Sequence, residues 1–478
     1  MFLKYSQTLK AHSLVILLLF FTITGMLGGC ASNMTGYYSD LRKSINREDY
    51  QAAADFVKKS QDEYGDKNIL LYYLDYGTVL HLAGDYDQST QNFESAKAKF
   101  DEYYTKSISA GAASMIFNDT ALPYYGQDYE RVYISLFEAL NYILSGDDNE
   151  AAVEARQVDS LFKTFAAQNN NQNFYKDDGF IRYFMGLVYE NAGYLNDAQV
   201  SYYGALKAYE TGIVNIAPPQ DLIDDAYTSA LALHFSSRAN EIKASYPQAA
   251  RRVMPAGYGE VIIINYNGYI PRKVQTVMQF ALFDIWPYVS QTTVDDESER
   301  RDFQTARSVS IAAFASDYVK VAFPAYQRIP NQIKYFTVDA GGDTKQSYVA
   351  QDLAELAQKV LDDEKGKIYA KTLARAAVKY VVGKVASKAV SDATGQGGLG
   401  FLTQVAFNVA NSLSETADER GWNTLPENIL MSRFYLPEGE NNITVQFRDF
   451  NGNVVEEKNL AVNITAGKKK FVFLRSER

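Results

Sequence analysis

The sequence predicts an α+β multidomain protein, in which α-helical repeats are followed by a β-sandwich-like domain with a helical-hairpin insertion. Apolar and small residues recur at helical spacing from about residue 37 to residue 245. Prolines and glycines break that spacing between Tyr246 and Gly259, and β-branched residues dominate the segments that follow. We therefore expect a helical repeat domain at 37–245, a β-rich domain at 258–478 and, inserted in it, a helical hairpin at 347–419.

The N-terminus has the regions of an export signal. Lys4 and Lys10 provide positive charge, the stretch from Leu14 to Phe21 is apolar but short for a membrane span, and small residues precede Cys30. Cys30 is the single cysteine of the chain. No disulfide is therefore expected to support the fold.

The segment Leu27-Gly28-Gly29-Cys30 resembles the lipobox of bacterial lipoproteins. The resemblance implies that residues 1–29 are a signal peptide, that Cys30 carries diacylglycerol and an acylated amine, and that residues 30–36 are a lipidated linker. Two acyl chains anchor a protein stably where one does not. In this family an aspartate after the cysteine favours the inner membrane, so Ala31 implies the outer membrane, facing the periplasm. The alternative is an ordinary signal or transmembrane anchor with an incidental cysteine.

The composition limits the classes of partner. The chain has 47 basic and 57 acidic residues, a formal charge of −10, and loss of Lys4 and Lys10 with the signal would give 45 minus 57, or −12. An acidic chain gains nothing from counterion release, which excludes nucleic acid as a partner. After residue 29 no stretch is long and apolar enough to cross a bilayer, so we expect a tethered soluble protein of two or three domains.

The first half of the chain reads as helical hairpins. Between Leu71 and Phe100, aromatic and small residues recur at helical spacing on both sides of a turn at Ala83-Gly84-Asp85. The pattern returns around Gly146 and Gly193, and a degenerate first unit surrounds Glu48. Its recurring positions are Tyr73, Tyr76, Gly77, Leu80, Phe93 and Ala96, then Ala139, Tyr142 and Ala151, then Gly186, Tyr189, Ala198, Tyr202 and Ala205.

These positions resemble the tetratricopeptide repeat, whose helices carry aromatic and small residues at the same offsets. The turn positions 48, 84, 146 and 193 are unevenly spaced, so the resemblance implies four hairpins with insertions over residues 37–210. We expect a closing helix from Asp221 to Ser245 and a long loop from Thr105 to Gln127. The alternative is a generic helical bundle with chance matches.

The second half is predicted to be rich in strands. Glu260 to Tyr266 reads as a buried strand, Asn267-Gly268 as a hairpin turn and Lys273 to Leu282 as the return strand. The last three strands are expected to form a meander. The remaining strands are predicted at 317–324, 333–338, 429–436, 442–448, 454–464 and 469–474.

The predicted insertion carries basic residues at helical spacing. We interpret Lys371, Arg375, Lys379, Lys384 and Lys388 as one basic face, with a second helix from Phe401 to Leu413. This face is a possible interaction surface for an anionic membrane or a partner helix. The alternative is a helix pair packed on the β-rich domain, with its charges merely solvated.

Residues that could carry catalysis are sparse. The histidines are His12, His81 and His234, and neither a metal cluster nor a catalytic network can be assembled from them. The stretch from Gly395 to Gly400 matches G-x-G-x-x-G but follows a helix, not a strand, which argues against a dinucleotide site. We therefore predict no catalytic, cofactor-binding or metal-binding residues, and a protein that is not an enzyme.

The order of lipobox, helical repeats and interrupted β-rich domain is similar to that of an uncharacterised family of proteobacterial envelope lipoproteins. This likeness favours a membrane-anchored periplasmic scaffold or adaptor, which binds protein partners of an envelope assembly or secretion process through its repeats. The alternative is a glycan-binding or peptidoglycan-associated module, or an enzyme, with its site in the β-rich domain.

Overall fold

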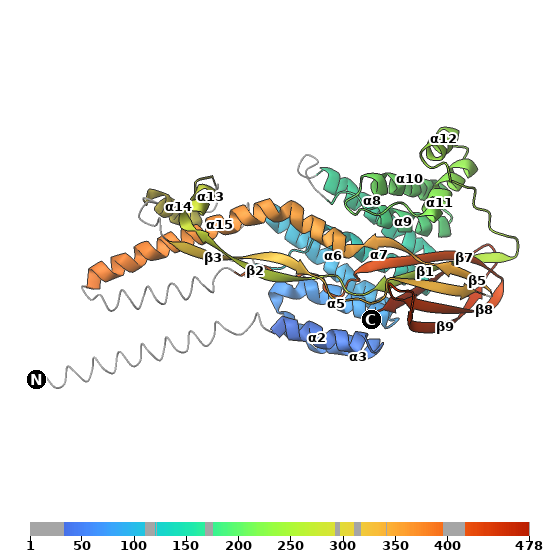
Figure 1. Ribbon diagram of the computed structural model, residues 1–478, viewed down its shortest axis with the longest axis horizontal. Helices are drawn as coiled ribbons and strands as arrows, with labels where there is room; N and C mark the ends of the chain where they lie inside the picture. The colour runs from blue at the N-terminus through green and yellow to red at the C-terminus, as the bar shows by residue number, and fades with distance from the viewer. Residues whose placement is uncertain are drawn as a thin grey trace, which may run out of the picture.

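The computed structural model describes residues 33–109, 120, 122–167, 175–291, 297–309, 317–340, 342–394 and 416–477. Figure 1 shows an elongated molecule, in which helices and sheets form a body and an arm projects from one end of it. The predicted signal peptide, Cys30 and the predicted helix from Phe401 to Leu413 lie outside the described residues. No helix within the described ranges combines the length and the apolar character that crossing a bilayer requires.

The first half consists of consecutive helices that contact one another as hairpins. The short segments α4 (Gln61–Tyr64) and η1 (Asp66–Asn68) connect the first hairpin to the second. The hairpins are α2 (Asn33–Ile45) with α3 (Tyr50–Lys59), α5 (Ile69–Leu82) with α6 (Tyr86–Ser109), α7 (Asp128–Ser145) with α8 (Asp148–Ala167), α9 (Gly179–Asn191) with α10 (Leu195–Thr211), and α11 (Gln220–Ala232) with α12 (Ser236–Ser245).

Each hairpin turns at a residue with positive φ. Glu48 (58°), Gly84 (78°), Gly146 (85°) and Gly193 (84°) occupy the four turn positions that the sequence predicts. A fifth, His234, has φ 58° and separates α11 from α12. The single closing helix from Asp221 to Ser245 was therefore a wrong prediction, because the left-handed residue there makes a fifth hairpin.

Glycines allow the helices of two hairpins to cross closely. A β-carbon placed on Gly77 would lie 2.7 Å from the ring of Phe93, and one on Gly186 would lie 2.5 Å from the ring of Tyr202. Ala96 and Ala205 are fully buried nearby in sequence, one turn further along the second helix. These contacts give the two units the same tetratricopeptide-like packing.

The loop predicted from Thr105 to Gln127 begins later than expected, because α6 continues to Ser109.

The second half contains two four-stranded sheets and a separate two-stranded ribbon. The first sheet has the strand order β10-β1-β7-β6, the second has the order β5-β4-β8-β9, and the ribbon is formed by β2 and β3. The strands are β1 (Tyr258–Asn267), β2 (Arg272–Ala281), β3 (Tyr318–Gln327), β4 (Tyr335–Ala340), β5 (Asp343–Gln346), β6 (Tyr348–Asp352), β7 (Asn428–Pro437), β8 (Gly439–Arg448), β9 (Val454–Ile464) and β10 (Lys469–Ser476).

The two larger sheets pack face to face, as predicted for a β-sandwich-like domain. Val261 and Ile263 of β1 share a buried apolar cluster with Phe336 of β4 and Val445 of β8. The alternate residues of β1, among them Ile264, point to the opposite side and join the core of the helical repeats. Strand β1 is thus buried on both faces, which is the position of a central strand.

Two strand pairings differ from the sequence prediction. Strand β1 pairs with β7 and, in parallel, with β10, whereas β2 leaves the sheet and pairs with β3. The predicted hairpin at Asn267-Gly268 was therefore wrong, although Gly268 does adopt φ 64°. The predicted meander is correct only for β8 and β9, because β10 crosses to the first sheet. Both errors come from assuming that consecutive strands pair, which is common but not obligatory.

The repeats and the sandwich share one hydrophobic core. A single cluster of buried residues contains Leu74 and Phe137 of the helices together with Ile264, Met431 and Phe471 of the first sheet. Domains normally have cores of their own. The predicted boundary near residue 250 therefore marks a change of secondary structure and not a boundary between two independent cores.

The arm has a separate core. It consists of the ribbon, α13 (Leu282–Gln291), α14 (Glu297–Ser308) and the long helix α15 (Leu353–Thr394). Buried side chains of these elements form a second apolar cluster, to which α15 contributes from Leu373 to Val381. The start of α15 belongs instead to the core of the body, through Leu353, Leu356, Ala357 and Val360. The insertion was predicted to start at residue 347, but residues 348–352 are β6 of the first sheet. The arm also includes β2 and β3, which the sequence had assigned to the sandwich.

Candidate functional site

The inner helices of the repeats are covered by the chain itself. Most residues of α5, α7 and α9 are buried, and in each helix the buried residues lie on all sides. The ring of Phe137 in α7 lies 5.2 Å from that of Tyr266 in β1, and the ring of Phe184 in α9 lies 6.4 Å from that of Phe471 in β10. The helical face that was expected to receive a partner is therefore occupied by the first sheet.

The segment that returns from the arm to the body fills the rest of this face. The Trp422 backbone N–H donates to Glu130 Oε1 at 2.9 Å, and the Thr424 hydroxyl donates to Asp75 Oδ1 at 2.8 Å. Asp75 also accepts from the hydroxyls of Tyr38 and Tyr64 at 2.7 Å and 2.8 Å. Burial raises the pKa of Asp75 to about 6, and these hydrogen bonds oppose the rise.

A second buried polar network joins the repeats to the first sheet. Arg433 of β7 donates to Glu260 Oε1 at 3.0 Å and 2.7 Å, and it also forms an ion pair with Asp225 of α11. Lys469 of β10 lies 2.9 Å from the other oxygen of Glu260. Although burial acts to raise the pKa of Glu260, the cations around it lower that pKa to about 2. All these groups are satisfied by one another, so we assign the network to structure.

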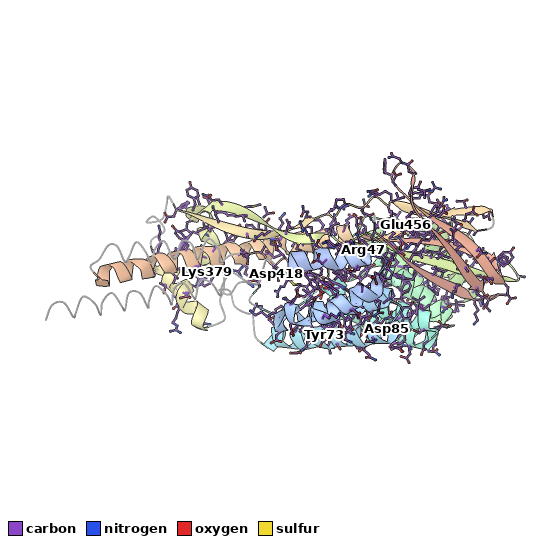
Figure 2. All side chains as sticks on the ribbon, turned by 90° about the horizontal axis from the view of Figure 1, so that it is seen from below. Arg47, Tyr73, Asp85, Lys379, Asp418 and Glu456 are labelled. Carbon is purple, nitrogen blue, oxygen red and sulfur yellow. The ribbon has the colours of Figure 1, made fainter. Side chains whose placement is uncertain are left out.

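An open cavity lies where the arm meets the body, and we call it the junction cavity. It has a volume of about 440 Å³. Figure 2 shows Asp418 at this junction and Lys379 further out on the arm. The cavity is lined by Leu122, Pro123, Tyr124, Tyr125, Gly126, Gln127, Lys273, Ala322, Pro324, Leu361, Glu364, Ile368, Lys371, Thr372, Arg375, Thr416, Ala417, Asp418 and Arg420.

The lining has more positive than negative charge. Four of its side chains are basic (Lys273, Lys371, Arg375 and Arg420), and two are acidic, Glu364 and Asp418. Its remaining surface is largely apolar, with leucine, isoleucine, proline and tyrosine side chains. A ligand that combines negative charge with apolar groups would match this lining.

Arg420 is a fixed part of the wall. Its guanidinium donates to both carboxylate oxygens of Asp418, at 2.8 Å and 2.7 Å, and to the carbonyl oxygen of Leu122 at 2.9 Å. It also lies 5.5 Å from the centre of the Tyr124 ring. These contacts connect the returning segment to the loop before α7.

Lys273 is the cation least restrained by contacts. Among the described residues its ammonium makes neither a hydrogen bond nor an ion pair, and it lies 5.9 Å from the centre of the Tyr326 ring. Burial alone would lower the pKa of Lys273, but Tyr326, Asp418 and nearby glutamates outweigh it, and the pKa is raised. Lys273 is thus positively charged at neutral pH and has donors available to a ligand. Across the cavity, burial raises the pKa of Glu364.

The predicted basic face does not exist as one surface. Lys371 and Arg375 line the junction cavity, but Arg375 is only 1% exposed. Lys384 pairs with Asp317 at 2.7 Å, Lys379 is half-buried, and the side chain of Lys388 lies outside the described residues. The prediction was wrong for Arg375, because several arm elements pack around this part of α15.

Helix geometry explains the error. Each residue rotates by about 100°, so a step of four residues adds about 40° and Lys384 lies roughly 220° around the helix from Lys371. A run of four-residue steps therefore spirals around α15 instead of following one face. The other charged residues of the cavity are Lys273, Glu364, Asp418 and Arg420. The sequence did not single them out, because they come from three different segments: β2, α15 and the segment that returns from the arm.

Other candidate residues have structural surroundings. His81 Nδ1 lies 2.6 Å from Asn141 Oδ1, and burial lowers the pKa of His81 to about 4. Within the described residues, one group of carboxylates (Glu94, Glu138 and Glu154) has metal-binding separations. The ammonium of Lys97 forms ion pairs with all three carboxylates. This lysine explains why three carboxylates can lie close together, and no metal ion is needed to explain it. Gly395 to Gly400 lies outside the described residues.

Comparisons with known proteins find similarity in solved structures alone. No protein-family model matches the chain, and no curated protein sequence matches it. The apo form of RapI is 11% identical, with a TM-score of 0.33, over 83% of this chain and 81% of that one. MamA is 13% identical, with a TM-score of 0.27, over 46% of this chain and 97% of that one.

A further match is the set of tetratricopeptide-like repeats from a Podosopora anserina putative kinesin light chain. It is 11% identical, with a TM-score of 0.29, over 45% of this chain and 92% of that one. The repeat assignment in this chain rests on its own hairpins, their left-handed turns and their glycine crossings.

Proposed function

We propose that the protein is a lipid-anchored adaptor of the cell envelope, and that its partner binds at the junction cavity. The observation that carries the proposal is the occupied inner face of the repeats. In tetratricopeptide-like scaffolds that face is available to a peptide, but here the first sheet and Trp422 cover it. The repeats thus act as the rigid body on which the arm and the cavity are positioned.

The cavity favours an acidic and partly apolar protein segment. Its surplus of basic side chains attracts carboxylates, and its tyrosine, proline and leucine side chains can bury apolar groups. Lys273 provides an ammonium that the described protein leaves without a hydrogen bond. The described lining contains no histidine, cysteine or serine, and we propose a binding role and not a catalytic one.

The membrane anchor is the second part of the proposal. The single cysteine, the short apolar stretch before it and the small residues at Gly28 and Gly29 support lipidation of Cys30. Ala31 supports the outer membrane, with the protein on the periplasmic side. Helix α2 begins at Asn33, so the proposed lipid would be close to the folded body.

A glycan-binding module or an enzyme in the β-rich half is the competing function. That function would require tyrosines able to stack on sugar rings. Tyr266 and Tyr269 in this half are 0% and 5% exposed, and they pack inside the shared core. Tyr258, Tyr288 and Tyr318 are 37%, 39% and 59% exposed, so the pull-down below is designed to distinguish a protein partner from a glycan.

A pull-down from detergent-solubilised envelopes tests the partner. Full-length protein should recover a defined protein, and Lys273→Gln should reduce its recovery strongly. Lys320→Gln is the matched control, because Lys320 is an exposed lysine on the same ribbon outside the cavity. Equal recovery by all three proteins would reject the cavity as the site. Recovery of muropeptides or polysaccharide would support the glycan-binding alternative.

Cys30→Ala tests the anchor. We expect the variant to lose both palmitate labelling and retention in the membrane fraction. A variant that is still labelled or still retained would disprove the lipoprotein assignment.

A further inference from the structure

Helix α13 on the arm carries aromatic residues on its exposed side as well as apolar residues on its buried side. Leu282, Ile285 and Val289 are buried in the core of the arm. Phe283 is 60% exposed and Tyr288 is 39% exposed, about 140° apart around the helix with the exposed Asp284 between them. Soluble helices normally place charged residues on their outer face, whereas here two aromatic rings share that face with one carboxylate.

The exposed aromatic surface extends onto the ribbon. Tyr318 is 59% exposed and pairs with Ala281, the residue before α13 begins. The Leu282 N–H donates to the Asp317 carbonyl oxygen at 2.8 Å, which fixes the start of α13 beside Tyr318. Trp286 is partly buried and belongs to the same helix. We call Phe283, Trp286, Tyr288 and Tyr318 the aromatic tip.

Charged residues of both signs surround the aromatic tip. Asp284 is exposed on α13 and Lys320 on β3, and the exposed Arg307 of α14 donates to the Val289 carbonyl oxygen of α13 at 2.8 Å. The rings of the tip supply apolar and aromatic contact, and high salt separates that contact from attraction by the nearby cations. This separates the tip from the basic-face hypothesis, which required an anionic surface.

The proposed anchor places a bilayer at the same end of the molecule. Asn33, the first residue of α2, follows Cys30 by three residue steps, and three steps span at most about 11 Å. Figure 1 shows that α2 begins at the end of the body from which the arm projects. A membrane attached at Cys30 would thus lie near the arm.

We propose that the aromatic tip docks into the interfacial zone of the bilayer that holds the acyl groups of Cys30. Tryptophan and tyrosine favour this zone, because their rings are apolar while their polar atoms stay hydrated. Two contacts, the lipid and the tip, hold the protein in one orientation, where a lipid alone would let it rotate. The proposal rests on the lipidation of Cys30 stated above.

Tryptophan fluorescence provides the test. The chain has two tryptophans, Trp286 in the tip and Trp422, which is 1% exposed in the body. Full-length lipidated protein is reconstituted in vesicles of phosphatidylcholine with brominated acyl chains, which quench tryptophans that enter the bilayer. We expect quenching that is unchanged by high salt and that Trp286→Phe abolishes. Quenching that persists in Trp286→Phe would overturn the proposal.

A second variant removes the exposed rings of the tip and keeps Trp286, the fluorescent residue that reports on contact with the bilayer. Phe283→Ser combined with Tyr288→Ser should remove most of the quenching of Trp286. The control is Val200→Ser, because Val200 is 58% exposed on α10 in the body, away from the tip. Equal loss in the control would contradict a specific role for the tip.

Flotation of the same vesicles separates this proposal from the anchor. Protein that floats without quenching rejects the tip and leaves the anchor intact, and it would favour a protein partner on this surface. Protein that does not float rejects both. Quenching in a preparation whose mass shows no lipid on Cys30 would support the tip and reject the anchor.

Discussion

The indole N–H of Trp422 donates a hydrogen bond of 3.0 Å to Thr78 Oγ1, which lies 344 residues earlier in the chain. The Trp422 ring also lies 5.3 Å from that of Phe137 and 5.8 Å from that of Phe93. The segment that returns from the arm is therefore inserted into the core of two repeats. The ring of Phe137 also packs against Tyr266 of β1. Trp422 and Phe137 therefore join the segment returning from the arm, the repeats and the first sheet in one set of packed side chains.

Trp422→Ala should destabilise the protein by about 3–5 kcal/mol, since it removes a large, fully buried ring. Trp422→Phe keeps an aromatic ring and should cost less. Urea unfolding followed by circular dichroism measures both changes. Trp286→Phe is the control, because Trp286 is partly exposed on the arm, and we expect it to cost less than about 1 kcal/mol. An unfolding free energy that Trp422→Ala leaves unchanged would show that the returning segment is not part of the core.

The shared core predicts a single cooperative transition for the body. Calorimetry of the full-length protein should show the repeats and the sandwich unfolding together, because Leu74, Ile264 and Phe471 belong to one cluster. Separate transitions for the two halves would contradict this and would restore the two-domain interpretation.

The glycine crossings provide a third prediction. Gly77→Ala and Gly186→Ala should each cost about 1–3 kcal/mol, because the added methyl group would meet the rings of Phe93 and Tyr202. Gly36→Ala and Gly366→Ala are matched controls, since both glycines are helical and have nothing within 4 Å of an added β-carbon. The controls should be neutral or slightly stabilising. An unchanged thermal midpoint for Gly77→Ala would argue against a helix crossing at this position.

These crossings show which features can be predicted from sequence. Gly77 and Phe93 have the same separation as Gly186 and Tyr202, 16 residues, and both pairs are joined by a short turn. Such local patterns identified the hairpins and their turn positions. The parallel pairing of β1 with β10 depends instead on contacts between distant segments, such as the bond between Asn265 and Ser476, which are 211 residues apart.

The candidate site was only partly predictable for the same reason. Lys371 and Arg375 stood out because they repeat within one helix. Lys273 and Glu364 became neighbours of the same cavity only when the ribbon packed near α15. The burial of Arg375 followed from the packing of the arm, which no pattern within the helix itself revealed.

Arg433→Met should destabilise the protein by about 3–5 kcal/mol, because it leaves Asp225 and Glu260 buried without their main cation. Arg251→Met is the control, since Arg251 is exposed, and it should change the unfolding free energy by less than about 0.5 kcal/mol. Equal effects of the two variants in urea unfolding would show that the buried network does not connect α11 to the first sheet.

The last prediction concerns pH. Burial raises the pKa of Asp75 and of Asp178 from 3.8 to about 6. Between these two values the folded protein holds protons that the unfolded chain has released, so stability falls as pH rises through this window. Above pH 6 the ionisation of each carboxylate lowers the unfolding free energy by on the order of 3 kcal/mol relative to pH values below 3.8. Glu260, whose pKa is lowered to about 2, has the opposite effect and loses its contribution only below about pH 4.5.

Urea unfolding at pH 5 and pH 7 measures this loss. Asp75→Asn cannot ionise, so we expect it to reduce the difference in unfolding free energy between the two pH values, whatever its own effect on stability at pH 5. Asp62→Asn is the control, because Asp62 is exposed, and it should leave the difference as it is in the unmodified protein. A pH difference that Asp75→Asn does not alter would mean that Asp75 is ionised at pH 5, held so by the hydroxyls of Tyr38, Tyr64 and Thr424.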